Sequence, residues 1–92
     1  MAKRVERVIR KTVGTTAENI DLGYQSAYIA NAGTTTLYVK EKDGDNKNAT
    51  SSNGFPIAAG AMINQPLAFR KLSVVSGEAG GELAILLVED FI

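Results

Sequence analysis

The middle of the chain contains two short runs that favour β-strands, separated by a break that favours a turn. Residues 27–30 and 35–39 are rich in aromatic, β-branched and other apolar residues, and residues 31–34 between them read Asn-Ala-Gly-Thr. Two such runs around a short Gly-containing break are typical of a β-hairpin. This stretch therefore predicts an antiparallel hairpin in which Tyr28 and Tyr38 are cross-strand neighbours.

The rest of the chain has the same pattern of short strand-like runs separated by turn residues. Residues 41–54 are polar and lack apolar periodicity, which predicts a long exposed loop that faces outward or meets a neighbouring subunit. Pro56 belongs at the start or edge of a strand because it has no N–H to donate to a central ladder. The apolar run at residues 82–88 predicts a buried central strand, and no segment predicts a helix of normal length. We therefore predict an all-β fold, a small β-sandwich or jelly-roll-like barrel of about seven to eight short antiparallel strands.

The N-terminal segment is the one charge-asymmetric part of the sequence. Its single acid, Glu6, is outnumbered by the cations Lys3, Arg4, Arg7, Arg10 and Lys11. Its apolar residues fit both a helical stripe and one face of a strand, so periodicity leaves open whether residues 1–13 are a basic arm or a first strand. As an arm, the five cations would contact an acidic surface of a partner, and as a strand they would form a solvated face. Residues 14–92 form the predicted β-sandwich domain.

Composition limits the functions that the chain can have. At 92 residues it supports one domain, and it contains neither cysteine nor histidine. Disulfides, thiolate metal sites and Ser–His or Cys–His nucleophile pairs are thereby excluded. A formal net charge of zero argues against a nucleic-acid binder that neutralises phosphates, and no apolar run approaches the roughly 20 residues of a membrane span. We expect no enzymatic activity and no nucleic-acid or membrane partner.

Two acidic clusters suggest chemistry, and both lack part of the required pattern. The stretch from Asp43 begins like a calcium-binding loop, but Gly54 stands where the bidentate Glu of such a loop would be. Glu78 and Glu82 flank a Gly-rich turn, and nothing in the sequence brings two carboxylates into one cleft as glycoside hydrolysis requires. We therefore expect no catalytic residues, no metal and no cofactor.

The three tyrosines are the remaining candidate contact residues. Tyr24, Tyr28 and Tyr38 would pack in the core or at a subunit interface, where tyrosines commonly bury their rings. The alternative is that they form a platform on which sugars or bases stack.

Three segments follow one another in a defined order, with a variable loop after the first. They are residues 29–39 (Ile-Ala-Asn-Ala-Gly-Thr-Thr-Thr-Leu-Tyr-Val), 53–60 (Asn-Gly-Phe-Pro-Ile-Ala-Ala-Gly) and 76–85 (Ser-Gly-Glu-Ala-Gly-Gly-Glu-Leu-Ala-Ile). In this order the chain resembles a loose family of small β-sandwich or jelly-roll proteins in the virions of tailed bacteriophages. The resemblance spans residues 19–89 and brings no catalytic residues with it.

The resemblance implies a virion structural protein that is made in the cytoplasm of the host bacterium and located on the capsid surface. We expect a capsid decoration (cement) protein, assembled as a homotrimer, that binds and stabilises the lattice of the major capsid protein. Residues 1–13 would then extend over the capsid. The alternative is a carbohydrate- or host-surface-binding β-module of a phage fibre or tail, which would use the tyrosines and the loop at residues 41–54.

Overall fold

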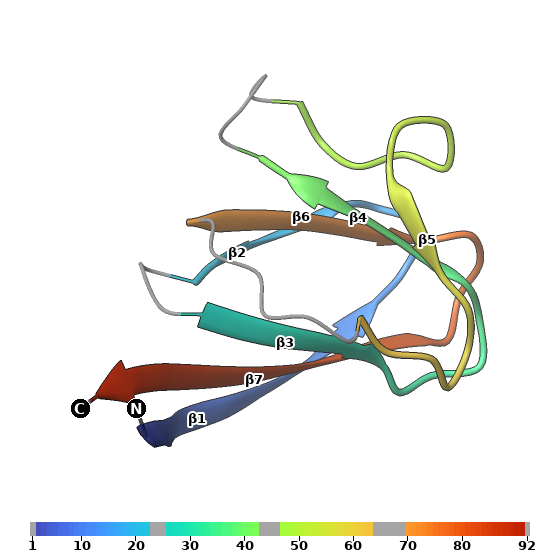
Figure 1. Ribbon diagram of the computed structural model, residues 1–92. Coiled ribbons are helices and arrows are strands. Elements are labelled where there is room, and N and C mark those ends of the chain that lie inside the picture. Colours follow the sequence, from blue (N-terminus) through green and yellow to red (C-terminus); the bar gives the residue numbers. More distant parts are fainter. Residues whose placement is uncertain (1, 23–25, 43–46, 64–69, 92) are drawn as a thin grey trace.

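The chain folds into two antiparallel β-sheets that pack face to face (Figure 1). The computed structural model describes residues 2–22, 26–42, 47–63 and 70–91, with side chains described between residues 8 and 88. The strands in this part of the chain are β1 (Ala2–Val13), β2 (Glu18–Asp21), β3 (Ser26–Asn31), β4 (Leu37–Glu41), β5 (Phe55–Ile57), β6 (Lys71–Ser76) and β7 (Gly81–Phe91). They confirm the predicted all-β sandwich. The described residues contain no helix that is long and apolar enough to cross a membrane.

The two sheets divide the strands unevenly. Sheet A has the order β1-β7-β3 and sheet B the order β2-β6-β4-β5, and every pairing is antiparallel. Strand β7 lies in the middle of sheet A, which confirms the central strand predicted at residues 82–88. The two ends of the chain lie together in Figure 1 because β1 and β7 pair along their length, with Ala2 opposite Phe91.

Alternation along each strand places one set of side chains between the sheets. In β3, Ala27 and Ile29 are buried, while Tyr28 and Ala30 are turned to the other face. The fully or nearly buried apolar residues that form the core are Val13, Ile20, Leu22, Ala27, Ile29, Leu37, Val39, Ile57, Leu72, Val74, Leu83, Ile85 and Leu87. Both sheets contribute to this core, so neither sheet buries its inner face without the other.

The prediction of a hairpin at residues 27–40 is wrong. Strand β3 pairs with β7 in sheet A, whereas β4 pairs with β6 and β5 in sheet B. The link at residues 32–36 therefore passes from one sheet to the other. Tyr28 and Tyr38 lie on different sheets and are not cross-strand neighbours.

Buried contacts of Asn31 and Gly33 explain this outcome. Asn31 is 2% exposed, and its Nδ2 donates to Thr35 O at 2.7 Å and to Ile57 O at 2.8 Å. Its Oδ1 accepts a hydrogen bond from Gly33 N–H at 3.0 Å. Gly33 itself lies so close to β7 that a Cβ there would come within 2.6 Å of Glu82 N. The Asn and Gly that indicate a tight turn in the sequence thus hold a connection between sheets.

Residues 2–13 form a strand, which decides between the two alternatives for the N-terminus. Strand β1 pairs with β7 from end to end, with a register shift between Val5 and Arg7. Val13 is fully buried in the core, and Ile9 packs against it. The segment is therefore part of the sandwich.

Candidate protein-binding face

The outer face of sheet A has an apolar centre. Pairing aligns Val8, Leu86 and Tyr28 in one row across the three strands. This row borders a shallow hollow of about 250 Å³, whose lining includes Val8, Tyr28, Ala30, Met62, Ala84 and Leu86. An antiparallel sheet with one solvated face usually alternates apolar inward and polar outward. Contiguous exposed apolar surface instead marks a site of interaction.

Two protruding side chains border this hollow, and two alanines line it between them. Val8 is 60% exposed and Met62 is 57% exposed, while Ala30 and Ala84 are half-buried. Met62 reaches this position because it forms a bridge with Ala30 at the edge of β3. The hollow is therefore built from three strands and one added segment.

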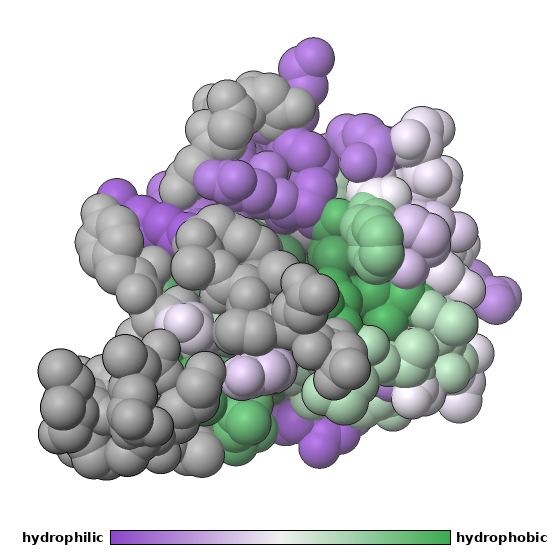
Figure 2. Space-filling view, in the orientation of Figure 1, coloured by the Kyte–Doolittle hydropathy of each residue, from purple (hydrophilic) through white to green (hydrophobic). Residues whose placement is uncertain are grey.

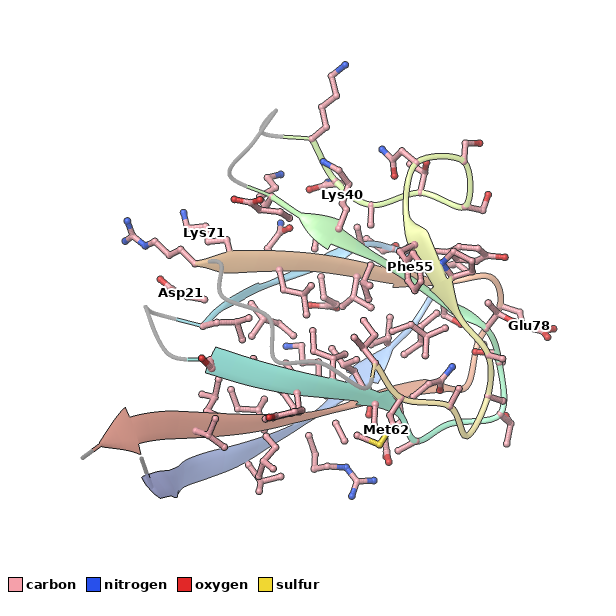
Figure 3. All side chains as sticks on the ribbon, in the orientation of Figure 1. Asp21, Lys40, Phe55, Met62, Lys71 and Glu78 are labelled. Atoms are coloured by element: carbon pink, nitrogen blue, oxygen red, sulfur yellow. The ribbon has the colours of Figure 1, made fainter. Side chains whose placement is uncertain are left out.

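A second apolar hollow adjoins the first. Its volume is about 410 Å³, and its lining residues are Phe55, Pro56, Ile57, Ala58, Ala61, Met62 and Ile63. Phe55 is 64% exposed, and Met62 borders both hollows. Figure 3 shows Phe55 beside β5 and Met62 at the level of β3 and β7. In the same orientation, Figure 2 shows hydrophobic surface right of centre, where Phe55 lies. The three exposed large apolar residues of the described part, Val8, Met62 and Phe55, thus belong to two neighbouring hollows.

Part of the outer face of sheet B is covered by the chain's own residues 47–54. Ala49 is only 3% exposed, and its N–H donates to Ser73 Oγ at 2.7 Å. Ser73 is fully buried although it lies on the outer side of β6. At the end of this segment, a Cβ on Gly54 would come within 2.7 Å of Tyr38 Cβ. Residues 47–54 form no strand or helix, and six of these eight are exposed, which agrees with the predicted exposed loop; the exception is Ala49, which seats the segment on sheet B.

The predicted partner-binding cations lie along β1, and two of them form ion pairs within the chain. The guanidinium of Arg10 pairs with the Glu82 carboxylate of β7, and Lys11 Nζ lies 3.5 Å from Glu18 Oε1 of β2. All four side chains are between one-third and two-thirds exposed, so each pair contributes about 0–1 kcal/mol to stability. These two cations are therefore balanced by acids of the same domain.

The other three cations are described by backbone position alone. In the register of β1 with β7, Lys3 stands opposite Asp90 and Arg4 opposite Glu89. Arg7 stands opposite Leu87. The side chains of Lys3, Arg4 and Arg7 lie outside the described side chains, so their role in partner binding stays a prediction.

The two described tyrosines, Tyr28 and Tyr38, do not share a surface. Tyr28 lines the hollow on sheet A, whereas Tyr38 lies on β4 beside Gly54 and lines a separate depression over sheet B. Tyr24 lies outside the described residues. The two described rings cannot form one stacking platform, and a role of Tyr28 at a subunit interface stays a prediction.

The sequence held a signal for the apolar face in the same run that predicts the central strand. In the run at residues 82–88, apolar residues occupy both sets of alternating positions, with Ala84 and Leu86 between the core residues Leu83, Ile85 and Leu87. A strand of an antiparallel sheet that is apolar on both sides predicts that both sides are covered. Only the inner side is covered by the opposite sheet.

No other site in the described part of the chain suggests chemistry. It contains no group of three or more acidic residues, histidines or cysteines that could hold a metal. Every buried polar side-chain atom described has a hydrogen-bond partner, so none is held ready for a ligand. No protein-family model matches the chain, and neither does any curated protein or solved structure at a significant level. The apolar face of sheet A is therefore the candidate functional site.

Proposed function

We propose that this protein is a structural component of a tailed-bacteriophage virion, a capsid decoration protein that binds the major capsid protein and stabilises its lattice. In this proposal it sits on the capsid surface as a homotrimer. The observation that carries the proposal is the apolar outer face of sheet A, where Val8 and Met62 are more than half exposed. The resemblance of residues 29–39, 53–60 and 76–85 to small virion β-sandwiches supports the choice of partner.

The lining of the hollow favours a protein partner over a small molecule. Sites for small ligands combine apolar walls with a few placed polar groups that fix the ligand's orientation. The hollow on sheet A is lined by aliphatic side chains and the ring of Tyr28. On a lattice, many copies of a modest contact add up because attachment is multivalent. A small apolar patch on each copy is then sufficient for stable decoration.

The glycan-binding alternative has less support. A sugar platform built from the tyrosines needs their rings on one surface. Tyr28 and Tyr38 lie on the outer faces of different sheets. We therefore give no second function.

Cosedimentation with assembled shells of the major capsid protein from the same virion tests the proposal. We expect the wild-type chain to pellet with the shells and Val8→Ser with Met62→Ser to weaken binding about tenfold or more, because two exposed apolar anchors are lost. Lys71→Ser is the control, since Lys71 is exposed but lies on β6 of sheet B and lines neither hollow. A wild-type chain that stays in the supernatant at saturating shell concentration would overturn the proposed function.

Deletion of residues 1–13 is not a usable test of binding. It removes the whole of β1 and takes Val13 out of the core. Loss of shell binding by such a truncation would report unfolding, so surface substitutions are needed.

A further inference from the structure

Strand β1 forms one edge of sheet A, and the direction of its backbone groups follows from the other edge. Asn31 N–H donates to Ala61 O, and Ile29 O accepts from Ile63 N–H. The N–H of Asn31 and the C=O of Ile29 therefore point away from β7. Because hydrogen bonding alternates along an antiparallel strand, the even-numbered residues of β3 are the ones that bond to β7. Ala32 N–H, which donates to Glu82 O, fits this alternation.

The same alternation fixes the direction of bonding in β1. A central strand bonds its two neighbours through alternate residues, so the residues of β7 that bond to β1 are Leu83, Ile85 and Leu87. Their partners in β1 are Lys11, Ile9 and Arg7. The alternate residues of β1 are Val8, Arg10 and Thr12. Their N–H and C=O groups therefore point away from β7, toward the free edge of the sheet. The side chains of these three are exposed as well.

The other sheet edges in the described part of the chain are protected. Strand β3 is capped by the backbone bonds to residues 61–63. Strand β2 has four residues, two of them acidic, and β5 has three residues with Pro56 at its centre. Short length, charge and proline are the devices by which natural sheets avoid unwanted pairing. Strand β1 has twelve residues, so it is the long edge of this fold.

We propose that β1 accepts an extended segment of a partner protein as an added strand along residues 8–12, next to the apolar hollow. The segment carries an apolar residue opposite Val8 and, two positions away on the same face, an acidic residue opposite Arg10. Its apolar side chain continues the row of Val8, Leu86 and Tyr28 across a fourth strand. Main-chain bonds supply attachment and the side-chain pattern supplies selection, as in other cases of strand addition. The identity of the partner as a virion protein rests on the proposed function.

Charge disfavours a second copy of β1 as the added strand. Two β1 strands could pair antiparallel through the outward N–H and C=O groups of Val8, Arg10 and Thr12. This register places Val8 opposite Thr12 and Arg10 opposite Arg10. Cα atoms of such directly opposed, hydrogen-bonded residues lie about 5.5 Å apart. Like charges directly opposite each other destabilise a strand pair. The register shift between Val5 and Arg7 further restricts regular pairing to the part of β1 that follows it.

A pair of substitutions at Thr12 isolates the edge N–H. Thr12→Pro removes this donor, which the fold does not use, while Thr12→Ala removes the same side chain and keeps the donor. In the shell cosedimentation assay we expect Thr12→Pro to bind at least about tenfold more weakly than wild type and Thr12→Ala to stay within about twofold. Thermal unfolding checks that Thr12→Pro is folded. Equal binding by folded Thr12→Pro and wild type would overturn strand addition while leaving the proposed function intact.

A second measurement tests the edge without shells and without a substitution. The ¹⁵N-labelled chain is titrated with the capped peptide Thr-Thr-Glu-Thr-Val-Thr at millimolar concentration, and amide exchange is followed by NMR. We expect slower exchange at Val8, Arg10 and Thr12 and no change at Ile9 and Lys11, whose amides already bond to β7. The control peptide carries Lys in place of Glu, which opposes Arg10 with a cation and should protect none of these amides.

The shell cosedimentation assay and the peptide titration distinguish failure of the proposed function from failure of strand addition. Protection of the edge amides without any wild-type shell binding would support strand addition and remove the capsid as the partner. Unchanged exchange at Val8, Arg10 and Thr12 with the Glu peptide would overturn strand addition, even where shells bind.

Discussion

The outer faces of the two sheets differ in how far the chain itself covers them. On sheet B, residues 47–54 lie over Ser73, which is fully buried, and Ala49 of this segment is buried against it. On sheet A, Val8 and Met62 remain more than half exposed around an apolar hollow. The chain thus supplies its own cover for one face, and among the described residues it supplies only Met62 and its neighbours for the other.

The chemistry of the two faces explains the difference. The cover of sheet B is held by a directional bond, from Ala49 N–H to Ser73 Oγ, and by the close approach of Gly54 to Tyr38. On sheet A the side chains of Val8 and Leu86 have no hydrogen-bonding group, so contact with this part of the face is apolar. This contrast predicts that substitutions on sheet B change stability, whereas substitutions on sheet A change association.

Among substitutions in the cover of sheet B, Gly54→Ala should have the largest effect on stability. Its Cβ would lie 2.7 Å from Tyr38 Cβ and 3.0 Å from Thr50 O, so the cover of sheet B has to move. We expect a loss of about 2–3 kcal/mol in the free energy of unfolding, measured by urea titration. Gly14→Ala is the matched control, because nothing lies within 4 Å of a Cβ there, and it should cost much less. Equal effects at both glycines would contradict a tightly seated cover.

Ser73→Ala should have the next largest effect. It leaves the buried N–H of Ala49 without its acceptor, and a buried donor without a partner costs about 1–3 kcal/mol. Ser51→Ala, on the exposed part of the same cover, should change stability by less than about 0.5 kcal/mol. Unchanged stability in Ser73→Ala would mean that water replaces the hydroxyl and that the cover is loosely held.

Val8→Ser should have the smallest effect on stability. Val8 is 60% exposed, so we expect the free energy of unfolding to change by no more than about 0.5 kcal/mol, while shell binding falls. The comparison is Val13→Ser on the same strand, where full burial makes a loss of about 2 kcal/mol or more the expected result. A large loss of stability in Val8→Ser would show that this face already has a cover within the chain.

The parts of the fold that follow from alternation were predictable from the sequence. The central position of β7 follows from its continuous apolar run, and the edge position of β5 follows from Pro56. The connection at residues 32–36 was not predictable, because Asn31 and Gly33 suit a hairpin turn and a buried inter-sheet link equally well. Only the choice of partners, β7 for β3 and β6 for β4, distinguishes the two, and that choice depends on residues more than 30 positions away.

The candidate site was visible only in part. The cations of β1 stand out in the sequence, but the pairing of Arg10 with Glu82 and of Lys11 with Glu18 depends on the sheet arrangement. The apolar row needs the register of three strands before Val8, Leu86 and Tyr28 can be placed side by side. Charge is a local property of the sequence, whereas this face is assembled from distant segments.

Hydrogen exchange of the shell-bound protein, read by mass spectrometry, tests the central contrast between the two faces most directly. The expected result is slower exchange in peptides that cover residues 8–12 of β1 and unchanged exchange in peptides that cover residues 47–54. Protection confined to residues 47–54, with β1 exchanging as in the free protein, would contradict the assignment of sheet A as the binding face.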